Sequence, residues 1–232
     1  MSVLARSRSN PLALAILSCL SEQPMHPYQI SATLKHRNKE ASIRLNYGSL
    51  YSVVGSLLKQ GLIAEHGTSQ DGNRPQRTIY AITPEGETEL VDWMRELIRM
   101  PVKEYPALEA GLALLPVLSP DTVVALLGER LDRLRASIEQ EQAGIAEAAQ
   151  MGLPQVLSIE GEYAVALLRA ERDFVESLIK SIDSKQIGGY EFWARMHQLR
   201  DEGVSLADLT RNPEKYFAAG EVTWMALDEA PD

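Results

Sequence analysis

Several polar side chains recur at helical spacing in one short stretch of the chain. Asn46, Ser49 and Ser52 follow one another every three residues, and Tyr47 and Tyr51 are four residues apart. On a helix, residues three and four apart lie on one side. Amide and hydroxyl groups donate and accept hydrogen bonds, and phenol groups can contact phosphates or thymine methyl groups. Such side chains in the first turns of a helix can reach base edges in the major groove of DNA.

The opposite side of this stretch is apolar. Leu50, Val53, Val54 and Leu57 follow the helical period, so we expect a helix over residues 46–60 whose apolar side is buried. The pattern by itself is equally typical of an amphipathic helix that packs on a core and leaves its polar side in water. The segment that follows favours the groove-binding interpretation, because it combines short strands with a basic turn.

Two short helices are expected before this stretch, where they would form the support for it. Asn10 followed by Pro11 is typical of a helix start, because the first can cap the backbone N–H groups and the second needs no partner for its nitrogen. We therefore predict helices over residues 11–21 and 27–37.

The apolar period changes after Gly61 from that of a helix to that of strands. Residues 62–66 and 78–82 are predicted strands, joined by a polar and basic turn. Thr83 is expected to cap a further helix over residues 84–100. Three helices, a two-stranded hairpin and a helix in this order predict a winged helix-turn-helix unit in a mainly α protein.

The rest of the chain is predicted to be entirely helical. We expect a DNA-binding domain of residues 1–100 and a helical domain of residues 101–232. A short helix over 107–115 precedes two long helices, of which the first covers 119–150, and a glycine–proline break between them predicts an antiparallel hairpin. One more helix is expected over 190–200, followed by an irregular tail. The large aromatic residues of this part are expected to lie mostly in the core: Tyr105, Tyr163, Phe174, Trp193 and Trp224.

Charge divides the chain in the same way. The whole sequence has a net charge of −9, but residues 1–83 hold 9 Lys and Arg against 4 Asp and Glu. Residues 84–232 hold 14 Lys and Arg against 28 Asp and Glu. A basic first third joined to an acidic remainder indicates that only the first part faces a polyanion.

Other classes of function find little support in the sequence. The single cysteine, Cys19, and four scattered histidines give no spacing for a metal site or a catalytic triad, and no glycine-rich phosphate loop is present. We therefore expect no enzyme activity, no metal and no cofactor. No stretch approaches 18 uncharged apolar residues, so we expect no membrane span and a cytoplasmic location.

The motifs of the first third resemble the PadR family of transcriptional regulators when they are taken in order. They are Pro27-Tyr28-Gln29-Ile30, Gly48-Ser49-Leu50-Tyr51, Gly61-Leu62-Ile63, Asn73-Arg74-Pro75-Gln76-Arg77 and Thr83-Pro84-Glu85-Gly86. The resemblance covers about residues 10–95. The long helices that follow are similar to those of family members with a large C-terminal dimerisation domain. Ser52 departs from the family pattern, in which a proline is common at that position, and Gly55 is an unusual residue inside a helix.

The resemblance implies a homodimer that binds an inverted-repeat operator in double-stranded DNA, usually as a repressor. It makes Tyr28 and Tyr51 phosphate or groove contacts, and it lays a wing with Arg74, Gln76 and Arg77 along the DNA backbone or in the minor groove. It also implies a small aromatic effector. Trp93, if exposed, could stack on such a ligand, although a packing role for this residue is the more common one.

Two other interpretations remain open. Winged helices also serve as adaptors that bind proteins without specific DNA binding, and the acidic helical part offers a large surface for that purpose. A sensor that does not bind DNA is the third. The basic wing and the polar helix face distinguish the first interpretation from the others.

Overall fold

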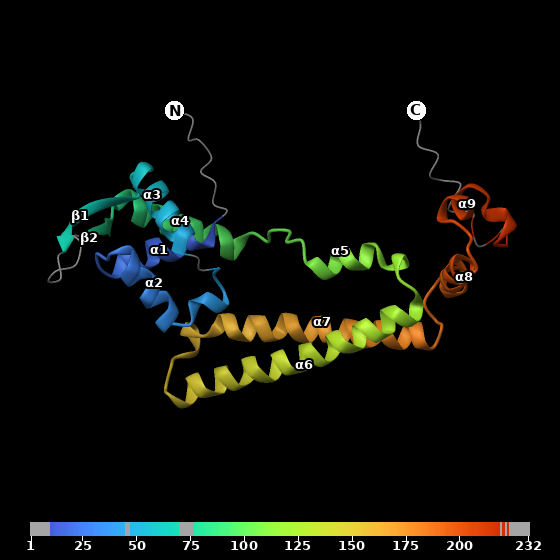
Figure 1. The fold of residues 1–232 in the computed structure, drawn as a ribbon. Coiled ribbons are helices and arrows are strands. Elements are labelled where there is room, and N and C mark those ends of the chain that lie inside the picture. The colour runs from blue at the N-terminus through green and yellow to red at the C-terminus, as the bar shows by residue number, and fades with distance from the viewer. Residues whose placement is uncertain (1–9, 45–46, 70–76, 219, 221, 223–232) are drawn as a thin grey trace. The chain divides into compact units, whose positions relative to one another are not determined.

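The computed structural model describes residues 10–44, 47–69, 77–218, 220 and 222. The chain divides into two compact units, Met1–Glu104 and Tyr105–Asp232, and each is considered by itself. Most described residues are helical, and the strands form one small antiparallel sheet (Figure 1).

The first unit is a winged helix, as the sequence predicts. Three helices precede a two-stranded wing, and a fourth helix follows it. Its elements are α1 (Pro11–Glu22), α2 (Pro27–His36), a 3₁₀ turn (Lys39–Ala41), α3 (Tyr47–Lys59), β1 (Ile63–Ser69), β2 (Arg77–Ile82) and α4 (Pro84–Arg99).

The core of this unit joins α1, α2 and α3 to the base of the wing. Ile16, Ile30, Leu50 and Ile63 are almost fully buried in one cluster. Their burial fixes the direction of α3, because its apolar side must face α1 and α2. The expected buried side of α3 is therefore confirmed, and its polar side is left at the surface.

The wing is tied to the start of α2 as well as to itself. In the hairpin, Ile63 pairs with Ile82, and the register shifts between Glu65 and Gly67. Met25 adds an isolated bridge, with reciprocal backbone hydrogen bonds of 3.0 Å to Tyr80. The residues just before α2 thus extend the sheet by one bridge and hold β2 beside that helix.

The cap that begins α4 also anchors the end of α3. The Thr83 hydroxyl accepts a hydrogen bond from the Gly86 N–H at 3.1 Å and donates one to the Gly61 carbonyl at 2.7 Å. Gly61 has φ +70°, the left-handed conformation expected of it as a helix-ending glycine. The predicted caps Asn10 and Ser119 are confirmed as well, with bonds from the N–H groups of the residues that follow them.

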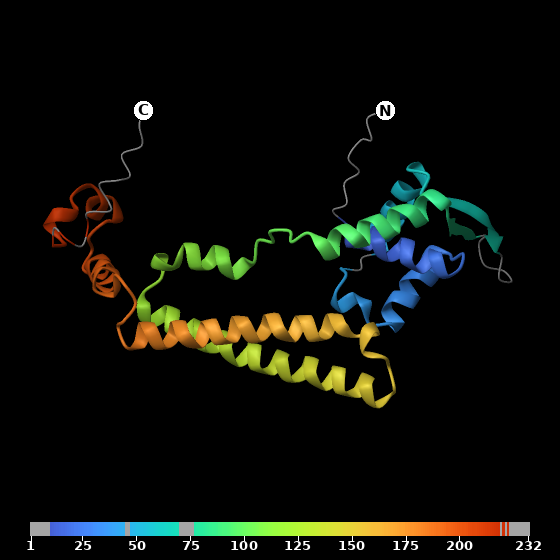
Figure 2. The same cartoon turned by 180° about the vertical axis from the view of Figure 1, so that it is seen from behind.

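The second unit is built around an antiparallel pair of long helices, as predicted (Figure 2). Leu127, Leu131, Leu134 and Ile138 follow the helical period along one side of the first long helix, and all but Leu131 are buried. Its elements are α5 (Ala107–Ala113), a 3₁₀ turn (Leu115–Val117), α6 (Pro120–Gln150), a 3₁₀ turn (Gln155–Leu157), α7 (Ile159–Asp183), α8 (Tyr190–Asp201), α9 (Leu206–Arg211) and a 3₁₀ turn (Pro213–Lys215).

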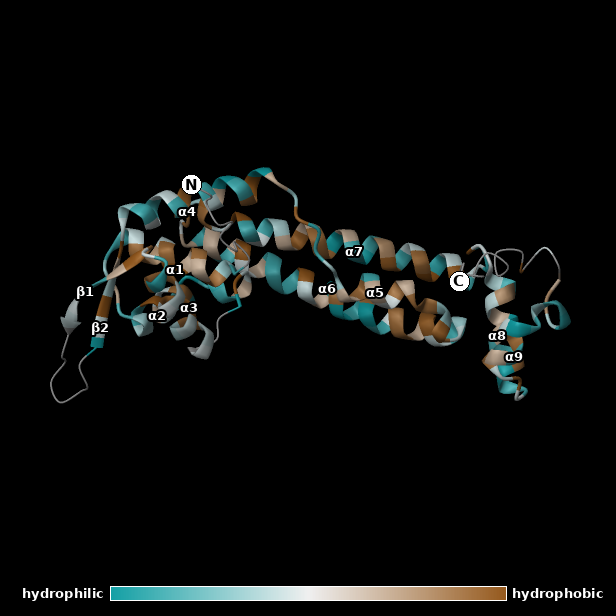
Figure 3. Ribbon diagram, turned by 90° about the horizontal axis from the view of Figure 1, so that it is seen from above, coloured by the Kyte–Doolittle hydropathy of each residue, from teal (hydrophilic) through white to brown (hydrophobic). Residues whose placement is uncertain are grey.

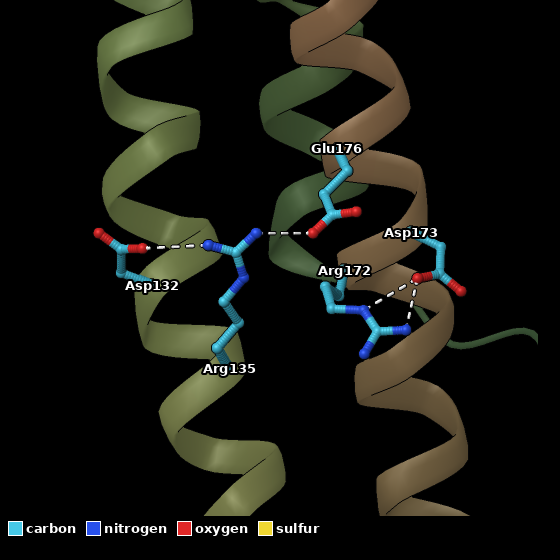
Figure 4. Close-up of polar contacts among 5 residues, drawn as sticks. All are labelled: Asp132, Arg135, Arg172, Asp173 and Glu176. Carbon is cyan, nitrogen blue, oxygen red and sulfur yellow. Dashed lines mark hydrogen bonds and ion pairs between the residues drawn. The ribbon is translucent and has the colours of Figure 1, made fainter.

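Ion pairs join the two long helices across their seam. Arg130 Nε donates to Glu171 at 2.6 Å, and Arg135 donates to Glu176 at 2.8 Å while Asp132 lies 3.6 Å from it. Figure 4 shows the Arg135 bridge between α6 and α7. These partly exposed pairs fix the register of the hairpin more than they stabilise it.

The part after α7 is more regular than the sequence predicts. The tail contains α9, whose first turn is capped by Ser205 accepting from the Asp208 N–H at 3.1 Å. Helix α8 packs through Trp193, whose indole N–H donates to the Leu118 carbonyl at 2.7 Å, and His197 lies 3.0 Å from the Pro116 carbonyl. Helix α8 therefore holds the segment that leads into α6.

The expectation that the aromatic residues of this unit lie mostly in the core is wrong for three of them. Tyr105, Tyr163 and Phe174 are exposed, whereas Trp193 is buried as expected. Trp224 lies outside the described residues. Figure 3 shows hydrophobic residues along α6 and α7. Helical periodicity reports that a face is apolar, but it does not say whether the same chain covers that face.

Candidate nucleic-acid interface

The polar face of α3 is at the surface of the winged helix. Ser49 and Ser52 are exposed, and the Tyr51 ring is about half exposed, while Leu50 on the opposite side is buried. The first turns of α3 therefore present hydroxyl groups to solvent on a helix that is rigidly held from behind. This is the arrangement that a recognition helix requires.

Some of the predicted contact residues lie where the structure gives no description. Asn46, Arg74 and Gln76 fall outside the described residues, and Tyr47 is placed only as the first residue of α3.

The structure brings two of the predicted residues into direct contact, Tyr28 and Arg77. The Arg77 guanidinium carbon lies 5.9 Å from the centroid of the Tyr28 ring, within the range of a cation–π interaction. Tyr28 is 55% exposed, so the pair is open to solvent. The Met25 bridge explains the contact, because it places β2 beside the start of α2. A phenol and a guanidinium thus meet at one surface point, where a phosphate would accept hydrogen bonds from both.

His26 is a residue of this surface that the sequence analysis did not select. Its ring Nδ1 accepts a hydrogen bond from the backbone N–H of Tyr28 at 3.1 Å, and the backbone N–H of His26 donates to Gln29 Oε1 at 2.9 Å. Partial burial, with the charge of Arg77 nearby, lowers the pKa of the imidazole below its usual 6.5. A polar residue directly before Pro27 is a helix-start pattern that could have identified this cap.

The pair Tyr28–Arg77 and the hydroxyl groups of α3 belong to one rigid body. Helices α2 and α3 share the core through Ile30 and Leu50, which are both almost fully buried. Neighbouring Arg37 takes no part in this surface, because Glu22 accepts two hydrogen bonds from its guanidinium at 2.5 and 2.7 Å. The candidate interface therefore combines a helix face, a helix start and a strand of the wing.

Trp93 is buried, at 5% exposure, so it offers no open ring for stacking in this protomer. Its indole N–H is buried without a hydrogen-bond partner among the described residues. Such a donor is costly to leave unsatisfied.

Two features of the described residues bear on other classes of function. They contain no group of three or more His, Cys, Asp or Glu side chains that could hold a metal ion. None of their helices is long and apolar enough to cross a membrane.

Comparison with known proteins agrees with this geometry. Residues 16–92 match the model of the transcriptional regulator PadR-like family. No protein of curated function matches the sequence.

Solved structures share the fold at low sequence identity. PadR of Bacillus subtilis in complex with operator DNA is 20% identical, with a TM-score of 0.61 over 75% of this chain and 99% of that one. The same protein in complex with p-coumaric acid is 20% identical, with a TM-score of 0.58 over 74% of this chain and 98% of that one. The virulence activator AphA of Vibrio cholerae is 16% identical, with a TM-score of 0.54 over 75% of this chain and 99% of that one. The first unit of this chain, over residues 16–92, thus matches the PadR-like family of transcriptional regulators, and solved PadR structures share its winged-helix fold.

Proposed function

We propose that this protein is a homodimeric repressor that binds an inverted repeat in double-stranded DNA, in the cytoplasm, where that DNA is found. The observation that carries the proposal is the contact of Arg77 with Tyr28 in the same unit that presents the exposed Ser49 and Ser52 of α3. Phosphate-binding and base-reading groups thus belong to one unit, in which α2 and α3 share a core. If α3 were only an amphipathic helix with its polar side in water, nothing would require β2 of the wing to contact α2.

The roles of the residues follow from their positions. Asn46, Tyr47, Ser49 and Ser52 read base edges from the first turns of α3, because short polar groups there fit a major groove. Tyr51 joins them at the edge of the groove. The phosphate contacts come from Tyr28, Arg77 and the wing residues Arg74 and Gln76, whose binding releases counterions and makes affinity depend on salt.

A dimer gives the operator its symmetry. Two α3 helices must be about 34–36 Å apart to enter successive major grooves of one DNA face. The helices of the second unit, above all α6 and α7, would pair the protomers and set this distance. Repression then follows from occupancy of the operator.

Release by a small aromatic effector is the second half of the proposal. B. subtilis PadR has been solved with p-coumaric acid, which is a phenolic acid. In this chain, the indole N–H of Trp93 has no hydrogen-bond partner among the described residues and is a donor that an acceptor atom of such a ligand could satisfy. An effector that changes the spacing of the two α3 helices would release the DNA, because both half-sites must be bound at once.

Fluorescence anisotropy tests the DNA half of the proposal. The protein is titrated against a duplex from its own upstream region and a scrambled duplex, at two salt concentrations. We expect tighter binding to the upstream duplex and a steep loss of affinity with salt. Equal and weak binding to both duplexes, at both salt concentrations, would contradict autoregulation and favour the adaptor interpretation.

A pair of double variants separates the wing from charge in general. Replacing Arg74 and Arg77 by Ala removes two positive charges from the wing, and replacing Arg200 and Arg211 by Ala removes two from the second unit. We expect the first variant alone to lose operator affinity and to reduce the salt dependence by about two phosphate contacts. Equal losses in both variants would contradict the assignment of the wing.

A further inference from the structure

One face of α7 is apolar and is not covered by the described residues of the second unit. Tyr163, Leu167 and Phe174 follow each other at spacings of four and seven residues and are 67%, 52% and 50% exposed. The opposite face of the helix packs on α6 and buries Val165 and Val175. We call the three exposed residues the α7 stripe. Aromatic and leucine side chains on this scale mark an interaction surface rather than scattered surface residues.

An apolar groove of about 470 Å³ lies between α5 and α6. Its walls are mostly leucines, and two arginines and a glutamate lie at its edge. The leucines that line it include Leu108, Leu112, Leu115, Leu126 and Leu127, and the arginines are Arg130 and Arg133. The Arg133 side chain is 81% exposed at the edge of this α5–α6 groove, where it pairs with Glu129 at 3.4 Å.

The stripe and the groove are neighbours on the same side of the helical hairpin. Arg130, which lines the groove, donates to Glu171 of α7 at 2.6 Å. Glu171 lies one turn beyond Leu167 and three residues before Phe174, at the flank of the α7 stripe. This ion pair is therefore the border between the two apolar surfaces.

We propose that a second copy of this chain covers both surfaces, the α7 stripe of each protomer entering the α5–α6 groove of its partner. The inference rests on the proposed dimer and names the faces that form it. A two-fold axis applies each contact twice, so two adjacent patches of complementary shape are buried together. It also explains why Tyr163 and Phe174 follow an apolar period but stay exposed among the described residues of the second unit.

The lengths of the two surfaces agree. Helix α7 rises about 1.5 Å per residue, so the stripe from Tyr163 to Phe174 is about 17 Å long. The part of α6 that lines the groove, from Val123 to Ser137, is about 21 Å long by the same rise. The stripe thus fits along the groove.

The charges at the edges are complementary as well. Acidic side chains flank the stripe, with Asp173 on one side and Glu171 on the other, while Arg130 and Arg133 lie at the groove. Asp173 is 63% exposed beside its local partner Arg172, and Arg133 is exposed beside Glu129. A second copy therefore brings the exposed Asp173 to a groove edge that carries Arg130 and Arg133 besides Glu129, and the excess of positive charge there favours this alignment of the two chains.

Disulfide trapping between two single variants tests the geometry directly. Leu112→Cys protein is mixed with Phe174→Cys protein, allowed to exchange subunits and oxidised. We expect a covalent dimer only in the mixture. The native Cys19 does not interfere, because it is buried and its thiol pKa is raised to about 11. Leu112→Cys mixed with Arg169→Cys is the control, since Arg169 is two residues from Leu167 and projects from another side of α7.

Light scattering on wild-type protein and Phe174→Asp completes the test. We expect a wild-type dimer, and for the variant a dimer dissociation constant raised about a hundredfold, as for an aromatic hot spot. A wild-type dimer with no cross-link, or with equal cross-links in mixture and control, would overturn the stripe-in-groove arrangement and leave the dimer standing. A wild-type monomer would overturn the proposed dimer itself.

Discussion

His26 shows how one titratable group can control a contact surface. As a neutral imidazole it accepts the Tyr28 N–H and so caps α2 at the point where Tyr28 meets Arg77. Protonation turns Nδ1 into a donor, which abolishes this bond. Because the folded state lowers the pKa of His26, stability that depends on the neutral form is lost as the pH falls from about 6.5 toward the lowered pKa.

Replacing His26 by Ala should cost about 1 kcal/mol of unfolding free energy at pH 7.5, the usual value of a helix cap. The difference from wild type should shrink as the pH falls through the window below 6.5, because the wild type then loses its own cap. Urea unfolding at pH 7.5 and pH 5 measures both. His26→Asn keeps a capping oxygen and should differ little from wild type at pH 7.5; a difference between wild type and His26→Ala that is independent of pH would contradict the cap.

Gly86 is required by a close approach of two backbones. A Cβ atom at this position would lie 2.0 Å from the Leu62 carbonyl oxygen and 2.8 Å from Ile82 Cγ1. We expect Gly86→Ala to destabilise the winged helix by at least about 2 kcal/mol, since α4 or the end of the wing must move. Chemical denaturation followed by circular dichroism measures the change. A decrease in unfolding free energy of less than about 0.5 kcal/mol, as for an ordinary surface substitution, would show that α4 is not tightly packed against the end of the wing.

At the scale of elements, the sequence predicts the helices and strands well because their signals are local. Asn10, Thr83 and Ser119 cap the helices expected of them, and the change of period at Gly61 locates the wing. The missed helix α9 had the same kind of signal, with Ser205 as its cap.

The contacts that the sequence could not predict join distant residues. Nothing in the local pattern places Arg77 over the Tyr28 ring, because the Met25 bridge that does so pairs residues from separate elements. The exposure of Tyr163 was missed for a related reason. An apolar period predicts burial, but the surface that provides it can belong to a second chain.

Helix α3 carries a glycine that its structure does not require. A Cβ at Gly55 would meet nothing within 4 Å, and this residue lies inside the helix. We expect Gly55→Ala to raise the unfolding free energy by about 0.5–1 kcal/mol, the difference in helix propensity. Paired with Gly86→Ala in one denaturation series, the two glycine variants should change stability in opposite directions. A loss of stability in Gly55→Ala would mean that α3 needs flexibility at this position.

For the whole molecule, the proposed function depends on the winged helices of two protomers acting together. A protein that holds both half-sites gains affinity from the second contact without any new type of interaction. The strongly acidic residues 84–232 oppose non-specific binding to DNA. The two basic winged helices of the dimer are therefore the source of affinity.

Phe174→Asp should therefore weaken operator binding by about a hundredfold or more while leaving binding to a single half-site duplex unchanged. The substitution lies on α7 and leaves α3 and the wing untouched. Anisotropy with full and half operators measures the two affinities. Arg169→Asp on another side of α7 is the control, and an equal loss on the half-site duplex would show that the winged helix itself was damaged.

The hydrogen bonds from α8 also set an order of events during synthesis. Trp193 bonds the carbonyl of Leu118, which was made 75 residues earlier, and His197 reaches back 81 residues to Pro116. At about 5–20 residues per second, a ribosome needs about 4–15 seconds to deliver the indole after the carbonyl. The winged helix is closed by contacts among residues 11–99 and can be complete before then. A nascent chain thus carries a complete winged helix for several seconds before α8 and α9 of the second unit are made. During that time the unit that would pair it with a second chain is incomplete.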